Sequence, residues 1–169
     1  MVKNFNDLNE KEIGALRGEY TKYFMKILAP LKYEFIPEFV KKAATYKVKL
    51  DAEYYSDEMI SKLEKGKRIG YVFIEGEIKA FITGRIYEDE AWISHLYTED
   101  MLSEYIKKRA VLELFNSIVL DFKNLGKDKV RTEAGYYEED LMDILESLGF
   151  EVEKTYIDGS TTYEKSIKY

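Results

Sequence analysis

The chain contains one histidine, His95, and no cysteine. Because an imidazole titrates close to neutral pH, His95 is the natural candidate for a general base. The absence of cysteine excludes disulfides, thiol nucleophiles and cysteine-ligated metals. A zinc site is also disfavoured, since carboxylates would have to supply nearly every ligand. We therefore predict proton-transfer chemistry without a bound metal.

The direction in which His95 points depends on how regular its strand is. Alternation places every second residue on one face, namely Trp92, Ser94, Leu96 and Thr98. His95 then falls on the other face with Ile93 and Tyr97. A β-bulge would re-aim His95, and bulges are common beside active sites. Two interpretations stay open, a catalytic base and a hydrogen-bonded structural histidine.

A short basic cluster, Lys107-Lys108-Arg109, lies near the start of a predicted helix. Helix starts usually favour acidic residues, so three cations there are unexpected, and they could contact a phosphate. The alternative is that they are ordinary solvated residues. With a net charge of −6 and no basic face, we expect no nucleic-acid partner.

Three helices are predicted in the N-terminal third. The first has an apolar stripe at steps of three and four residues, namely Ile13, Leu16, Tyr20, Phe24 and Ile27, and it ends before Pro30. The second covers residues 37–46. The third covers 56–63, with Ser56 as its N-cap and Gly66 as its stop.

From residue 69 the pattern changes to strands. Residues 69–74 and 78–86 form a hairpin around Glu75-Gly76, and 91–98 is the third strand. A helix over 102–125 has a buried stripe, namely Val111, Phe115, Ile118, Phe122 and Leu125. It is followed by a strand (129–134), a helix (138–147) and two strands (149–156 and 161–167).

The long helix between strands 91–98 and 129–134 predicts a parallel pair. We therefore expect an α/β fold, a mixed and mostly antiparallel sheet flanked by helices, forming one domain over residues 1–169. No apolar run is long enough to cross a membrane and none reads as a signal peptide, so we expect a cytoplasmic protein. Abundant Lys and Glu without Cys or Gln favour a thermophilic source, with an AT-rich genome as the alternative.

Three segments resemble the GNAT acyltransferase superfamily in their order and spacing. They are the hairpin YVFIEGEI at 71–78, the strand ISHLYT at 93–98 and LESLGF at 145–150. The resemblance runs from about residue 50 to the end and loosely includes the N-terminal helices. It implies a GNAT-like fold, an acyl-CoA donor and an amine acceptor.

The resemblance also implies a binding site for acetyl-CoA. The pantetheine would lie along Leu96, Tyr97 and Thr98, and the diphosphate would sit at the start of the next helix. The family motif there, Q/R-x-x-G-x-G/A, aligns with SEYIKK at 103–108, so that Ile106 and Lys108 replace its small residues. We predict that the diphosphate site is formed by Ile106, Lys107, Lys108 and Arg109.

The catalytic residues implied by the resemblance are a base beside the central strand and a tyrosine acid. His95 is the candidate base, and Glu133 is a second carboxylate near the expected cleft. The family tyrosine aligns with Leu145, which cannot donate a proton, so Tyr136 or Tyr137 would replace it. We predict His95, Glu133 and Tyr137 as catalytic residues, with Trp92 lining the acceptor site or the core.

The sequence therefore leaves two hypotheses for the function. The first is an acetyl-CoA-dependent N-acetyltransferase acting on a primary amine of a small molecule or protein. The alternative is a catalytically inactive GNAT-like module that binds a ligand or partner. The aromatic content of 15% would also suit a self-associating protein, and a homodimer is left open.

Overall fold

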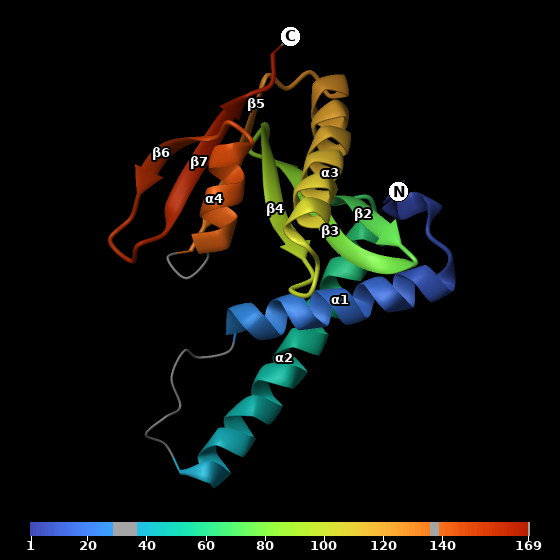
Figure 1. The fold of residues 1–169 in the computed structure, drawn as a ribbon, viewed down its shortest axis with the longest axis vertical. Coiled ribbons are helices and arrows are strands. Elements are labelled where there is room, and N and C mark those ends of the chain that lie inside the picture. The colour runs from blue at the N-terminus through green and yellow to red at the C-terminus, as the bar shows by residue number, and fades with distance from the viewer. Residues whose placement is uncertain (29–36, 136–138, 169) are drawn as a thin grey trace. The chain divides into compact units, whose positions relative to one another are not determined.

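The structure is a computed structural model that describes residues 1–28, 37–135 and 139–168. The chain divides into two compact units (Figure 1). The sheet unit comprises Met1–Phe5 and Lys67–Tyr169, and the helical unit comprises Asn6–Gly66. The single domain expected over residues 1–169 stays a prediction.

The sheet unit is built on a mixed sheet. Its strands are β1 (Val2–Asn4), β2 (Ile69–Glu75), β3 (Glu77–Tyr87), β4 (Glu90–Thr98), β5 (Lys129–Ala134), β6 (Glu151–Thr155) and β7 (Thr161–Ser166). Their order across the sheet is β1-β2-β3-β4-β5-β7-β6. Of the strand pairs in the described residues, β4 and β5 are parallel and the others are antiparallel. The predicted parallel pair and mixed α/β architecture are confirmed.

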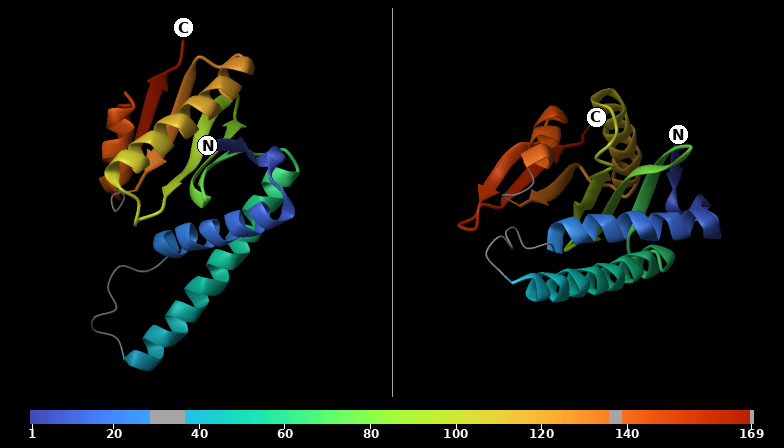
Figure 2. Two further views of the ribbon diagram at one scale, coloured as in Figure 1. Left: turned by 45° about the vertical axis from the view of Figure 1, so that its right-hand side comes forward. Right: turned by 60° about the horizontal axis from the view of Figure 1, so that its bottom comes forward.

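Helices α3 (Glu104–Asn124) and α4 (Glu139–Ser147) pack on the same face of this sheet (Figure 2). We call it the core face and the other the opposite face. Four of the predicted stripe residues of α3 are buried, namely Val111, Phe115, Ile118 and Phe122. The prediction for Leu125 was wrong, because Leu125 is the C-cap and is exposed. Past the last helical residue a side chain no longer follows the helical stripe, and Gly126 then turns the chain at φ +78°.

The first strand was missed by the sequence analysis. Strand β1 pairs with β2, with Val2 opposite Phe73, and the N-terminal ammonium group donates to the Ile74 carbonyl at 3.0 Å. A strand of three residues is too short to show alternation. Its pairing with a partner about seventy residues away in the chain defines it.

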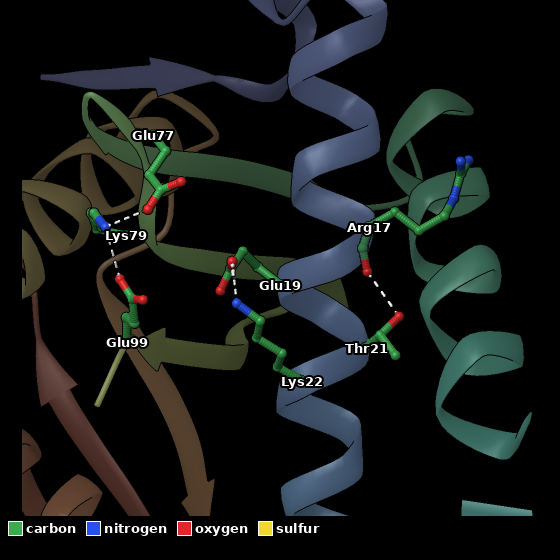
Figure 3. Close-up of polar contacts among 7 residues, drawn as sticks. All are labelled: Arg17, Glu19, Thr21, Lys22, Glu77, Lys79 and Glu99. Atoms are coloured by element: carbon green, nitrogen blue, oxygen red, sulfur yellow. Dashed lines mark hydrogen bonds and ion pairs between the residues drawn. The ribbon is translucent and has the colours of Figure 1, made fainter. Parts of the chain in front are cut away.

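The helical unit contains α1 (Glu10–Leu28) and α2 (Glu38–Glu64). Asn9 caps α1: the Glu12 amide donates to its side-chain oxygen at 2.8 Å, and the Asn9 amide donates to the Glu12 carboxylate at 3.1 Å. Within α1 the Thr21 hydroxyl donates to the Arg17 carbonyl, and Lys22 contacts Glu19 (Figure 3). Both contacts lie within single turns of the helix.

Helix α2 corrects the prediction of two separate helices over 37–46 and 56–63. It is continuous over 27 residues, because no Gly or Pro interrupts the sequence between them. Ser56 is not an N-cap. It is fully buried, and its hydroxyl donates to the Arg17 carbonyl at 2.7 Å. Gly66 does follow the helix end, at φ +70°, as expected.

Within the described ranges, none of the helices combines the length and apolar character needed to cross a membrane.

Candidate functional site

Strand β4 contains a β-bulge beside the histidine. Thr83 of β3 lies opposite His95, but the next residue, Gly84, lies opposite Ile93. Ser94 is therefore the extra residue on β4, with no residue opposite it in the register. The bulge changes which face of the sheet each later side chain of β4 meets.

The bulge brings His95 onto the face that carries Trp92. Residues that lie opposite each other in an antiparallel pair share a face. Gly84 and Ile93 share the core face, since a Cβ on Gly84 would lie 2.7 Å from the Ile118 side chain of α3. His95, opposite Thr83, therefore shares the opposite face with Trp92. Strict alternation had placed the two residues on different faces, and this prediction was wrong because of the bulge.

The ladder between β4 and β5 is short and ends beside the bulge. It covers Ala91 to Ile93 on β4, and Ile93 lies opposite Thr132 of β5. The Thr132 hydroxyl donates to the Ile93 carbonyl at 3.1 Å and closes this last pair. In the described sheet, β4 continues beyond the bulge from His95 to Thr98 in register with β3 only. The separation of two parallel strands provides an edge along which an extended ligand can lie.

The three residues predicted to bind pantetheine all lie on this segment. Leu96 packs against the core, whereas Tyr97 stacks on Phe81 with ring centroids 5.0 Å apart. Thr98 lies opposite Ala80 at the end of the ladder. The two side chains at 96 and 97 therefore hold the strand in place from both faces, and the backbone remains the ligand-binding group that the prediction requires.

The turn after β4 is fixed to β3. Lys79 lies between the carboxylates of Glu77 and Glu99, at 2.7 Å and 3.1 Å (Figure 3). The Glu99 amide also donates to the Lys79 carbonyl at 2.9 Å. Hydrogen bonds from these two carboxylates raise the pKa of Lys79, so its ammonium form is favoured. This turn sets where the next helix begins.

Helix α3 begins at Glu104, inside the segment aligned with the diphosphate motif. Ser103 is its N-cap, and the Ser103 hydroxyl accepts from the Ile106 amide at 3.3 Å. The Lys107 amide donates to the Ser103 carbonyl at 2.9 Å. The capping hydroxyl thus occupies one amide that a bound phosphate would otherwise use. Glu104 adds a negative charge to the same turn.

The predicted diphosphate residues differ in their surroundings. Ile106 packs against the core, and Lys108 is exposed. Lys107 lies 4.0 Å from the Glu104 carboxylate. Arg109 contacts Glu113 at 2.8 Å, and this carboxylate raises the pKa of Arg109. Ion pairs on exposed helix surfaces are weak, so both cations can exchange their carboxylate for a phosphate.

Of the other two predicted catalytic residues, the structure describes only Glu133. Glu133 is exposed on β5 and alternates with Thr132, which places it on the opposite face with His95. Tyr137, like Tyr136, lies outside the described residues. In the described part of the chain, no three His, Cys, Asp or Glu side chains gather as a metal-binding group would.

Sequence reasoning missed a row of residues across the opposite face. Arg85 of β3 lies opposite Trp92 of β4, which lies opposite Arg131 of β5. Arg131 contacts three carboxylates from three strands, Glu90 and Glu153 at 3.2 Å each and Glu164 at 3.8 Å. This network cannot be predicted from residue spacing in the sequence, because it forms only when β7 inserts between β5 and β6.

A second arginine lies close to Arg85. Burial and the charge of Arg85 lower the pKa of Arg68. The pair brings positive charge to the side of Trp92 away from Arg131, in a chain whose net charge is −6. The net negative charge of the chain therefore does not predict the local positive charge that Arg68 and Arg85 bring to this face.

Comparison with known proteins identifies the architecture. No family model matches the sequence, and no curated protein matches it either. Solved structures do match over nearly the whole chain. The aminoglycoside 6'-N-acetyltransferase from Enterococcus faecium is 13% identical, with a TM-score of 0.65 and coverage of 100% of this chain and 98% of that one. The chain has the GNAT acetyltransferase fold.

Two further GNAT structures were determined with ligands. The PaiA N-acetyltransferase from Thermoplasma acidophilum, in complex with coenzyme A, is 18% identical, with a TM-score of 0.65 and coverage of 98% and 99%. The Campylobacter jejuni N-acetyltransferase PseH, in complex with acetyl coenzyme A, is 15% identical, with a TM-score of 0.58 and coverage of 99% of each chain. At these identities the likeness concerns the GNAT fold, and the chemistry must be argued from this chain's residues.

Proposed function

We propose that the protein is an acetyl-CoA-dependent N-acetyltransferase that acts on a primary amine of a small molecule or a protein. The proposal is carried by the bulge at Ser94. This one irregularity puts His95 on the face of Trp92, at the point where the β4–β5 ladder ends. A base and a ligand-binding strand edge thereby meet at one place.

The chain offers groups for each part of the co-substrate. The backbone of Leu96, Tyr97 and Thr98 would bind the pantetheine, because the β4 ladder with β5 has ended there. Lys107, Lys108 and Arg109 would bind the diphosphate through their side chains, since the glycines that let a backbone approach phosphate are missing. When bound, acetyl-CoA supplies the activated acetyl group.

His95 acts in this proposal as the general base. A protonated amine is not a nucleophile, so a group beside the acceptor must take its proton before attack. The bulge aims the imidazole at the face on which Trp92 would contact the acceptor. Glu133, on the same face of β5, is the second candidate for this role, and Tyr137 is the proposed acid that protonates the departing thiolate.

The test combines coenzyme binding with turnover. Coenzyme at about a hundred times its dissociation constant should stabilise the protein by about 2.7 kcal/mol, which a thermal shift detects. Turnover releases a free thiol, and because the chain has no cysteine, a thiol reagent reports the product without background from the protein. Small primary amines and lysine-containing peptides would be offered as acceptors. Absence of any thermal shift at millimolar coenzyme would remove the proposal.

One observation favours the inactive binding module instead. Ser103 caps α3 and Glu104 follows it, so the helix start already contains a hydrogen-bond acceptor and a negative charge. A helix N-terminus occupied in this way competes with an incoming phosphate. The absence of both a thermal shift with coenzyme and thiol release on any acceptor would support this second function, so the same two assays separate the two proposals.

A further inference from the structure

Helix α2 presents a line of large apolar side chains to solvent along its first half and across its middle. Tyr46, Leu50 and Tyr54 recur every four residues and are exposed by 65%, 47% and 60%. We call these three residues the α2 stripe. Phe39, exposed by 73%, lies nearly two turns further toward the helix start. Single exposed apolar residues are ordinary, but a line of them along one helix indicates a contact surface.

The residues of α2 that are buried lie in its second half. They are Ala52, Ser56, Met59, Ile60 and Leu63. Over residues 38–51 the helix therefore has no buried side chain whose packing would stabilise it. A helical segment of this length is marginal in water by itself. A partner helix against the α2 stripe would supply the missing packing.

The charges of α2 identify the partner. Residues 38–50 contain four lysines and one glutamate, whereas residues 51–64 contain five carboxylates and one lysine. The helix dipole favours the reverse, with acids near the start and bases near the end. Stabilisation of the isolated helix thus does not explain this charge order. An antiparallel copy of the same helix explains it, because each basic half then lies over an acidic half.

We propose that the protein forms a symmetric dimer through α2, with the two copies antiparallel and the twofold axis close to Leu50. The α2 stripe is symmetric about this point, since Tyr46 and Tyr54 lie four residues on either side. Leu50 then meets its own copy, and Tyr46 meets Tyr54 of the other chain. Such self-complementarity is what a twofold interface requires. This role is additional to acetyl transfer and independent of it.

Cysteine cross-linking tests the geometry, because the chain has no native cysteine. Leu50→Cys should cross-link to itself on oxidation. Two copies of Tyr46→Cys would lie roughly 12 Å apart along the helices, from the rise per residue, which is beyond disulfide reach. Tyr46→Cys and Tyr54→Cys should each form no cross-link alone, and they should cross-link to each other when mixed. Self cross-linking of Tyr46→Cys without the mixed product would overturn the antiparallel arrangement.

Charge reversal tests the partner. Lys42→Glu/Lys47→Glu gives the first half of α2 a net negative charge, like that of the second half. Glu53→Lys/Glu58→Lys removes the net negative charge of the second half, so that nothing attracts the basic half of the other copy. Each variant should lose the dimer, and an equimolar mixture should recover a heterodimer with twice the 19.9 kDa chain mass. Analytical ultracentrifugation reads the mass, and circular dichroism checks that α2 stays helical. Lys168→Glu, exposed near the end of the sheet unit, is the matched control and should stay dimeric.

The oligomeric state of the wild-type protein is the decisive measurement. It should sediment as a dimer at micromolar concentration and lose the dimer with Leu50→Glu. A wild-type chain that remains monomeric up to high micromolar concentration would overturn it. So would a dimer that survives both Leu50→Glu and the two charge reversals, since the contact would then lie elsewhere.

Discussion

Strand β4 and the start of α3 are neighbours in the chain, yet they differ in how much of the expected site they keep. In β4 the bulge, the end of the ladder with β5 and the aim of His95 fit acyl transfer. At α3 the glycines are absent, and Ser103 and Glu104 occupy the turn. A bulge needs only an extra residue, whereas a backbone cradle for phosphate needs positions without a Cβ. The strand geometry therefore tolerates sequence change that the helix start does not.

The largest effect is expected at His95. If His95 takes the proton from the amine, His95→Gln should lower kcat by about 10²–10⁴-fold, because a positioned base contributes that much. The KM for acetyl-CoA should change little, since the coenzyme is bound by other groups. Steady-state kinetics measures both constants. Glu151→Gln, exposed in β6, is the control, and a fully retained rate in His95→Gln would move the role to Glu133.

The next effect concerns the packing that holds the bulge. A Cβ on Gly84, opposite Ile93, would lie 2.7 Å from Ile118 and 2.8 Å from Phe122. Gly84→Ala should therefore lower the free energy of unfolding by about 1–3 kcal/mol through overpacking. Urea denaturation measures it. Gly18→Ala in α1, where nothing lies within 4 Å of the new Cβ, should raise stability by about 0.4–1 kcal/mol instead.

A smaller effect is expected at the start of α3. Replacing Lys107, Lys108 and Arg109 by Ala should weaken coenzyme binding roughly tenfold, because exposed charges are partly screened. Titration calorimetry gives the dissociation constant. Glu104→Gln removes the competing negative charge and should strengthen binding. If the triple variant binds as tightly as the wild type, the basic cluster is an ordinary solvated surface and the coenzyme uses other groups.

The smallest effect concerns an ion pair that joins the turn before β4 to the segment after the end of α3. Asp89, in the turn before β4, pairs with Lys127 just after α3, and the hydrogen bond and charge of Lys127 lower the pKa of Asp89. A lowered carboxyl pKa gives stability that is present above the unfolded value of 3.8 and is lost as pH falls through the folded value. The melting temperature of Asp89→Asn should consequently lose part of the acid dependence seen in the wild type. Thermal melts of both proteins at pH 6 and in acid measure this. A difference in melting temperature between wild type and Asp89→Asn that is the same at both pH values would contradict the prediction.

Much of the fold could be predicted from local chemistry. The turn at Gly76, with φ +78°, and the stop at Gly66 were predicted because glycine takes left-handed conformations readily. The strand at Lys129–Ala134 was predicted to its last residue. The capping box of Asn9 and Glu12 was visible in the sequence and was not used. By contrast, the break expected before Ser56 had no Gly or Pro to cause it.

The candidate site was predicted only in part. Residue type alone selected His95, and the spacing from Thr98 placed the basic cluster at the start of α3. The network of Arg131 with Glu90, Glu153 and Glu164 was not predictable, because its members come from four strands whose lateral order is not local information. The same holds for Arg68 beside Arg85.

The sequence by itself determined the elements, because the period of the apolar residues and the positions of Gly and Pro act over a few residues. It also determined the reversed charge order of α2. Only the tertiary structure decided that Ser94 is the extra residue of β4 and that His95 therefore shares a face with Trp92. A strand has no local preference for where an extra residue falls, since the bulge is defined by its register with β3. That register depends on packing Gly84 and Ile93 beneath α3, contacts that form only when the sheet assembles.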